Sequence, residues 1–315
     1  MANDTHSTTG QASSELKILV CYHKPYAMPP LDDGTLLPIH VGKAISNIDL
    51  HMQGDNEVNG QPCDNISEKN PNWCELTAIY WAWKNLKKLY PDIKYIGMSH
   101  YRRFFSFGNQ RVANRNIDEL KNYRVDTEKV VKILESGKII APKKYRVTIT
   151  VGIAYCMVHM SSDYHACREI IRDDFPDYFP SFQKVFECGN DFYTANMFVM
   201  KYEDFTQYCE WLFSVLFKLE MKINPQNYDS YRRRVYGFLS ERLFKVWLIR
   251  NKKKVQSLRV CLYANSETNH DSGRKSIFTK VASFLIRGTS YVMDKVILKL
   301  FVFRSGFMEN LRRRF

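Results

Sequence analysis

The sequence predicts an α/β protein, in which helices pack against the faces of a β-sheet. Short apolar runs, each followed by polar or turn residues, alternate along the chain with longer segments whose apolar residues recur every three or four positions. The 315 residues are 45% hydrophobic, which is enough to bury a sizeable core. The sequence has no glycine-rich nucleotide loop, metalloprotease motif or hydrolase nucleophile motif, so its function must come from less common motifs.

The first predicted strand is the apolar run at residues 16–22, which ends at His23-Lys24-Pro25 as a buried strand that opens into a loop would. Residues 27–72 are rich in Pro, Gly, Asp and Asn, and we expect them to form long loops with a functional role. Later apolar runs of similar length predict further strands at 94–100, 138–142 and 196–200.

Helices are predicted where apolar residues return at the spacing of one helix face. In the first of them, Leu76, Ile79 and Trp83 share such a face. Helical segments precede or follow each later strand, which is the alternation that an α/β fold requires. The expected helices are residues 74–90, 127–136, 162–173, 202–221 and 228–250.

The chain is expected to comprise a disordered polar leader at 1–15, one domain at 16–255, a linker at 256–275 and a basic helical tail at 276–315. The net charge is +13, and residues 274–315 hold ten Lys or Arg against two acidic residues, which is +8 of that total. No uncharged run in the tail reaches the roughly 20 residues that span a bilayer. We therefore expect the amphipathic tail to lie on an anionic membrane surface, or alternatively to pack against the rest of the protein.

Several unusual motifs occur in a fixed order along the chain. They are His23-Lys24-Pro25-Tyr26, residues 54–56, residues 64–77, residues 96–104, residues 196–200 and residues 237–243. Over residues 16–250 these motifs resemble the DUF4422 family of capsular and O-antigen polysaccharide glycosyltransferases. The resemblance implies a GT-A-like, Rossmann-type nucleotide-sugar-binding sandwich and a UDP-sugar donor. Members with assigned activity are similar to β-galactofuranosyltransferases that use UDP-galactofuranose, which implies inverting transfer to a lipid-linked or polysaccharide acceptor.

Sugar transfer needs positive charge near the leaving diphosphate, and Arg102 and Arg103 can supply it because guanidinium groups bind phosphate oxygens in pairs. His100, which ends a predicted strand, is a second candidate for this role. Enzymes of the GT-A type commonly end this strand with Asp-x-Asp to hold a divalent cation, whereas His100-Tyr101-Arg102 stands here. Dependence on Mn²⁺ or Mg²⁺ therefore stays open. The remaining residues expected to frame the nucleotide are His23, Lys24, Asp64, Asn65 and Lys69.

A carboxylate must accept the proton of the acceptor hydroxyl. By its order in the resemblance, Glu241 in Ser240-Glu241-Arg242-Leu243 is the first candidate, and Asp191 in a loop is the competitor. An ordinary helix-surface ion pair between Glu241 and Lys245 is the alternative. Tyr101 and Asn196 are assigned to the acceptor.

Two other classes of protein compete with the glycosyltransferase. Arginines alternate with aromatic rings at residues 101–105, as in proteins that bind single-stranded nucleic acid, but no nucleic-acid-binding module is recognisable and we expect no such partner. A non-catalytic carbohydrate-binding protein would also suit the missing Asp-x-Asp. The leader lacks the pattern of a secretory signal, so we expect a cytoplasmic protein at the inner face of the plasma membrane.

Overall fold

The apolar run Leu16–Tyr22 forms β1, in which every residue is buried because both faces of the strand are covered. In the computed structural model, which describes residues 15–108 and 114–265, β1 pairs in parallel with β2 (Leu36–His40) on one side and β6 (Tyr95–His100) on the other. β3 (Gln53–Gly54) extends the sheet beyond β2. The carboxyl ends of β1, β2 and β6 therefore meet at one edge, where polar residues follow each strand.

Beyond β6 the sheet closes on itself. β6 pairs with β7 (Arg103–Ser106), β7 with β13 (Lys254–Ala264), β13 with β9 (Lys138–Pro142), β9 with β12 (Phe198–Lys201), and β12 again with β6. This ring is a small closed β-barrel, and β8 (Asn114–Asn116) pairs with the last residues of β13. Two short sheets join β4 (Glu57–Val58) to β5 (Gln61–Pro62) and β10 (Tyr145–Arg146) to β11 (Asp191–Phe192).

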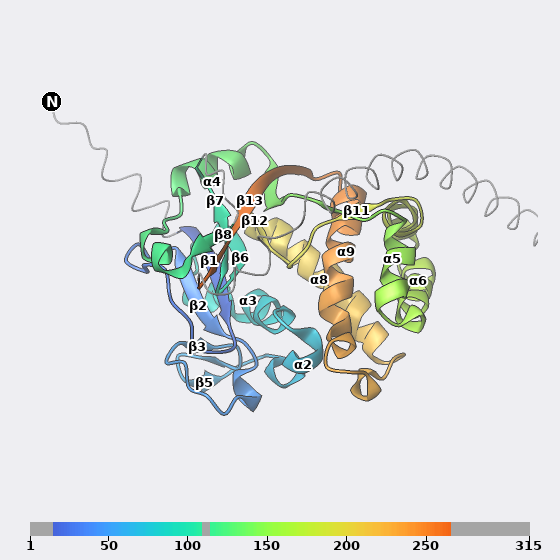
Figure 1. Ribbon diagram of the computed structural model, residues 1–315, viewed down its shortest axis with the longest axis horizontal. Helices are drawn as coiled ribbons and strands as arrows, with labels where there is room; N and C mark the ends of the chain where they lie inside the picture. Colours follow the sequence, from blue (N-terminus) through green and yellow to red (C-terminus); the bar gives the residue numbers. More distant parts are fainter. Residues whose placement is uncertain (1–14, 109–113, 266–315) are drawn as a thin grey trace, which may run out of the picture.

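Helices cover both faces of the sheet because its residues alternate between two cores. Leu19 and Cys21 of β1 pack on the same side as α3, α8 and α9, whereas Ile18 and Val20 pack with α4. The α5–α6 pair lies on the far side of α9 from the barrel (Figure 1). The α-helices are α2 (Asn70–Trp73), α3 (Leu76–Leu89), α4 (Thr127–Glu135), α5 (Val151–Val158), α6 (Ser161–Asp174), α7 (Phe179–Phe182), α8 (Tyr202–Glu220) and α9 (Val235–Arg250). Shorter helical turns are η1 (Lys43–Ile45), η2 (Ser67–Lys69), η3 (Ile117–Asn122), η4 (Pro176–Tyr178), η5 (Gln183–Glu187), η6 (Pro225–Asn227) and η7 (Arg232–Arg234).

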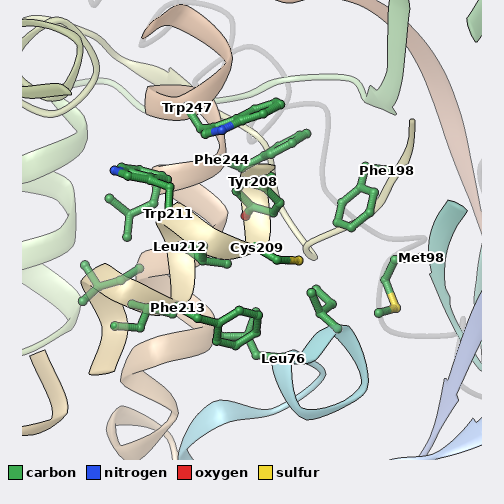
Figure 2. Close-up of a cluster of buried hydrophobic side chains, with 14 of the residues drawn as sticks. Leu76, Met98, Phe198, Tyr208, Cys209, Trp211, Leu212, Phe213, Phe244 and Trp247 are labelled. Carbon is green, nitrogen blue, oxygen red and sulfur yellow. The ribbon is translucent and has the colours of Figure 1, made fainter. Parts of the chain in front are cut away.

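Aromatic side chains join the helices to the barrel. Figure 2 shows Tyr208 of α8 beside Phe244 and Trp247 of α9, with ring centroids 5.3 and 5.4 Å apart. Phe198 of β12 continues the cluster to Phe244 at 5.8 Å. Burying each such ring contributes on the order of 2 kcal/mol, so this cluster holds α9, and every side chain on it, in a fixed position against β12.

The mixed α/β class is confirmed, and the strands and helices predicted between residues 16 and 250 are present close to their expected bounds, except that the helix expected at 228–250 begins only at Val235, after η7. The predicted linker starts too early, because residues 256–264 belong to β13 and pair with β9, β7 and β8. The run of lysines at 252–254 suggested that the domain ended there. The residues that follow form a strand, in which Leu258, Val260 and Leu262 share one face. The expected loops at 27–72 also contain β2 to β5. The leader (apart from residue 15) and the tail lie outside the described residues, and no helix of the described part could cross a membrane.

Candidate active site

A cavity of about 830 Å³ opens at the edge where β1, β2 and β6 end. We call it the central cavity. It is lined by residues that follow these strands, by the start of α3, by the segment before β12 and by α9 with the turn that precedes it. The lining residues used below are His23, Glu75, His100, Tyr101, Arg102, Arg103, Thr194, Ala195, Arg233, Arg234, Phe238 and Glu241.

The hairpin between β6 and β7 supplies one wall. His100 pairs with Arg103, so only Tyr101 and Arg102 form the turn. Tyr101 is buried and packs edge-on against Tyr26, with ring centroids 4.8 Å apart. The backbone carbonyl of Arg102 accepts a hydrogen bond from the Tyr263 amide at 2.9 Å. Held from both sides, this turn is a rigid support for its arginine side chains.

Four arginines face the cavity, against two glutamates, among the residues that the structure describes. The Arg102 Nε is buried and has no hydrogen-bond partner within the described residues. Burial and the neighbouring Arg102 lower the pKa of Arg103 from its ordinary 12.5, yet a guanidinium group stays charged at neutral pH. Arg234 is oriented by a contact from its Nε to the Cys74 Sγ at 3.2 Å. The excess of positive charge suits an anionic ligand with several oxygens, such as a diphosphate.

Glu241 projects from α9, and its side chain is 17% exposed. One carboxylate oxygen accepts a hydrogen bond from the Ala195 amide at 2.5 Å, and the other lies 3.5 Å from the Arg242 Nη1. Burial raises the pKa of Glu241 to about 7, because Arg242 and the Ala195 amide offset only part of the cost of desolvation and Glu75 adds repulsion. A carboxyl group with this pKa can exchange a proton at neutral pH, as a general base must.

A strained backbone segment connects Glu241 to His100. Ala195 and Asn196 both adopt left-handed conformations, with φ of 68° and 46°, which non-glycine residues rarely do. The Ala195 amide is bound to Glu241, and its carbonyl lies 2.6 Å from the His100 Nε2, which must therefore carry the proton. The Asn196 side-chain amide donates a hydrogen bond to the Glu75 Oε1 at 2.8 Å. This segment sets the positions of Glu241, His100 and Glu75 together.

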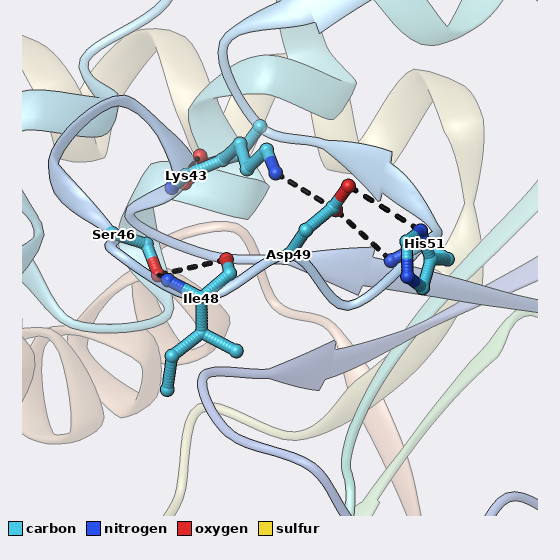
Figure 3. A network of polar contacts seen from close by, with 6 residues as sticks. Lys43, Ser46, Ile48, Asp49 and His51 are labelled. Carbon is cyan, nitrogen blue, oxygen red and sulfur yellow. Dashed lines mark hydrogen bonds and ion pairs between the residues drawn. The ribbon is translucent and has the colours of Figure 1, made fainter.

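The loop after β2 closes the cavity near Val41. Buried Asp55 accepts hydrogen bonds from the amides of Gly42 and Lys43, at 2.8 and 3.1 Å. Further out, Asp49 pairs with the Lys43 Nζ at 2.9 Å and accepts from the His51 amide at 3.0 Å (Figure 3). The loop is thus fixed from both ends by two carboxylates.

The side chains of the described residues do not gather into a metal site. Nowhere in residues 15–108 and 114–265 do three His, Cys, Asp or Glu side chains gather as ligands of one ion. In the cavity, Glu75 and Glu241 are already engaged by Asn196 and the Ala195 amide.

Residues 17–253 match the family model described as "Domain of unknown function (DUF4422)". The chain belongs to the DUF4422 family. Among solved structures, this DUF4422 chain is similar to the apo structure of the bifunctional glycosyltransferase WbbM, with a TM-score of 0.70 and 32% sequence identity. That match covers 80% of the chain but 46% of WbbM, so the chain spans just under half of its relative. No curated protein gave a significant match.

Within the DUF4422 domain, the central cavity brings together six of the predicted site residues. They are His23, His100, Tyr101, Arg102, Arg103 and Glu241. Lys24 is exposed and does not line the cavity, although its Nζ lies 5.7 Å from the centre of the Tyr101 ring. Asn196 is buried behind the wall and accepts a hydrogen bond from the Ser240 hydroxyl at 2.9 Å, so it supports the site and does not line it.

Three residues expected at the nucleotide lie elsewhere in the DUF4422 domain. Asp64 accepts a hydrogen bond from the Tyr80 hydroxyl at 3.0 Å, Asn65 donates to the Cys63 carbonyl at 2.8 Å, and Lys69 forms an ion pair with Glu220 at 2.6 Å. These contacts attach the segment before α2 to α3 and α8. Their polar character reflects the need to hold a loop, and they do not reach the cavity.

Asp191, the competing base, lines a different cavity of about 800 Å³. It pairs with Lys245, and Lys144 and Arg146 lie within 3.8 and 3.9 Å. Burial alone would raise the pKa of Asp191, but these cations outweigh it and the pKa lies below its ordinary value. Lys245 therefore pairs with Asp191 and not with Glu241, and Asp191 is a weak proton acceptor.

The sequence reasoning missed Glu75, Arg233 and Arg234 as cavity residues. Glu75 was visible inside the motif Trp73-Cys74-Glu75, and the two arginines lie in a run of three before a helix. Neither signal states that α9 and the start of α3 meet at one cavity, because this juxtaposition arises from tertiary packing between α2 and α9.

Proposed function

We propose that the protein is a glycosyltransferase that moves a sugar from a nucleotide-sugar donor to a saccharide acceptor. The observation that carries this proposal is that one cavity is lined both by four arginines and by a glutamate, Glu241, whose pKa is about 7. The similarity to WbbM, a bifunctional glycosyltransferase, supports it. Since the chain spans just under half of WbbM, the assignment of one activity to this chain is itself part of the proposal.

In this proposal the guanidinium groups bind the donor diphosphate. Arg102 and Arg103 come from the rigid β6–β7 hairpin, and Arg234 comes from the turn that precedes α9. Bidentate contacts to phosphate oxygens stabilise the negative charge that builds up as the bond to the sugar breaks. Arginines thus take the part that a divalent cation plays where acidic ligands are present.

Glu241 then acts as the general base. The acceptor hydroxyl oxygen forms a bond to the anomeric carbon while the bond from that carbon to the diphosphate oxygen breaks, and the nucleoside diphosphate leaves with the electron pair. The hydroxyl proton passes to the Glu241 carboxylate. One displacement inverts the anomeric centre, which agrees with the β-linked product implied for UDP-galactofuranose by the family resemblance.

The fold type, the acceptor and the location of the enzyme also belong to this proposal. A GT-A-like fold fits the parallel β2–β1–β6 arrangement with the cavity at its carboxyl edge. We propose an acceptor that is lipid-linked or part of a growing polysaccharide, and a cytoplasmic enzyme held at the inner face of the plasma membrane by its basic tail. The excess of basic residues at 274–315 supports this placement.

Donor binding can be measured by titration calorimetry with UDP, with and without Mn²⁺. We expect wild-type protein to bind UDP without metal, and Arg234→Gln to weaken binding at least tenfold because a charge-assisted phosphate contact is lost. Arg250→Gln is the matched control, since Arg250 pairs with Asp177 on the surface outside the cavity. Binding only with Mn²⁺ would contradict the role of the arginines, and binding of single-stranded DNA but not UDP would favour a nucleic-acid-binding protein.

Turnover separates the enzyme from a non-catalytic carbohydrate-binding protein. Glu241→Gln keeps the shape of the side chain and an acceptor for the Ala195 amide, but it cannot take a proton. We expect transfer from UDP-galactofuranose to fall at least 100-fold with UDP affinity within twofold of wild type. Asp191→Asn, in the other cavity, should keep most of its turnover. Equal losses in the two variants would argue against Glu241 as the base.

A further inference from the structure

A second, smaller hollow adjoins the central cavity. It has a volume of about 330 Å³ and shares three lining residues, Arg103, Thr194 and Ala195, with the central cavity. We call it the side cavity. Its other walls come from the barrel, where Val260 and Leu262 project from the same face of β13. The two hollows therefore meet at the hairpin arginine and at the strained peptide that binds Glu241.

The walls of the side cavity combine apolar surface with a few polar groups. Met197 and Pro142 are buried and join Val260 and Leu262 as apolar surface. Asn114, Lys143, Arg103 and Arg259 add hydrogen-bond donors around it. A sugar ring carries apolar C–H groups on its faces and hydroxyl groups at its edge, and small-molecule sites are typically apolar with a few placed polar groups. The mixture of apolar surface and hydrogen-bond donors thus suits a saccharide.

The two hollows differ in the charged residues that line them. The central cavity has four arginines and two glutamates, whereas the side cavity has Arg103, Lys143 and Arg259 and no acidic residue among the residues described. Arg102, Arg233 and Arg234 face the central cavity and do not line the side cavity. The arginines that share a cavity with Glu241, and that are proposed to bind the donor diphosphate, therefore lie in the central cavity. The side cavity shares only Arg103 with that group, and it borders Ala195, whose amide lies 2.5 Å from Glu241.

We propose that the side cavity is the acceptor subsite, where the terminal saccharide of the acceptor binds with its reacting hydroxyl directed past Ala195 toward Glu241. This inference rests on the proposed function, because a separate acceptor site has a use only if sugar transfer takes place. Arg103 lies at the junction of the two ligands. Tyr101, assigned to the acceptor from the sequence, does not line the side cavity and packs against Tyr22 and Tyr26.

The test measures saccharide binding directly and does not depend on turnover. The probes are octyl β-galactopyranoside, octyl β-glucopyranoside and octyl β-N-acetylglucosaminide, detected by saturation-transfer difference NMR in the presence of UDP. Val260→Trp fills the side cavity, and Val158→Trp adds the same bulk at an exposed position on α5 outside both cavities. Lys143→Ala is a second variant whose exposed side chain can be lost without affecting folding.

We expect wild type and Val158→Trp to bind at least one glycoside, Val260→Trp to lose at least five-sixths of that signal, and Lys143→Ala to lose about half. UDP affinity, measured by calorimetry, should stay within twofold in all variants. Three outcomes would each overturn the acceptor subsite. They are a glycoside signal in Val260→Trp equal to that of wild type, no signal from any glycoside with wild type, and a loss of UDP binding in Val260→Trp that parallels the loss of glycoside binding. If wild type binds a glycoside but not UDP, the proposed donor chemistry fails while the subsite stands.

Discussion

At the scale of single residues, the pKa of Glu241 links structure to activity. The folded state holds this pKa near 7, well above the ordinary 4.5, chiefly because the carboxyl is buried. Below pH 7 the group is increasingly protonated and cannot accept a proton. We therefore expect kcat/KM to fall about tenfold per pH unit on the acid side, with an apparent pKa about 7.

Glu75 provides the control for that profile. Its negative charge contributes to the raised pKa of Glu241, so Glu75→Gln should move the acid limb to lower pH. The raised pKa of Glu241 also makes the stability of the protein depend on pH. A carboxyl group whose pKa is raised by folding stabilises the folded state at low pH, and this contribution is lost as the pH rises toward 7. Thermal melting should show wild type losing stability relative to Glu241→Gln between pH 5 and 7. Glu241 would not be the titrating group if the acid limb of the kcat/KM profile stayed in place in Glu75→Gln and if wild type and Glu241→Gln melted alike across this pH range.

At the scale of elements, Gly97 determines how closely β1, β6 and β12 approach. A Cβ atom at this position would lie 3.0 Å from both the Ile18 Cγ1 and the Val199 Cγ2. Gly97→Val should therefore lower the free energy of unfolding by about 1–3 kcal/mol through overpacking. Because β6 carries His100, we also expect weaker UDP binding.

Denaturant unfolding gives the measurement, and Lys201→Val is the matched control. It places a valine at an exposed position of β12, where surface substitutions change stability by less than about 0.5 kcal/mol. Similar stabilities for the two variants would show that the strands can separate to admit a side chain, contrary to the packing described.

At the scale of the whole molecule, β13 is the last strand in the part of the chain that the structure describes. It occupies residues 254–264 and completes the barrel between β9 and β7. A chain cut after Asn265 should keep its cooperative melting transition and UDP affinity, whereas a chain cut after Lys253 should not fold. Co-sedimentation with phosphatidylglycerol vesicles should be strong for the full chain and weak for the longer fragment, because the basic tail is missing. Equal vesicle binding would place the membrane contact elsewhere.

Local sequence patterns predicted most of the strands and helices of this molecule, but they did not predict how these elements pack together. β1 and β9 have the expected bounds because an apolar run between polar residues needs no knowledge of its neighbours. Barrel closure depends on pairing between strands more than 100 residues apart, as in β13 with β9, and no local signal reports it. The site follows the same division. His100 to Arg103 lie where a predicted strand ends and were found, whereas Arg234 reaches the cavity only through the packing of α9.

The position of β13 in the ring also bears on how the chain is made. Ribosomal synthesis runs from the amino terminus, so β6, β7, β9 and β12 all emerge before the strand that joins β7 to β9. Until then β7 and β9 each present an unpaired edge, which is the kind of surface that recruits other strands. The nascent chain therefore carries a high risk of aggregation just before β13 emerges, and a chaperone that shields those edges would have most effect at that moment.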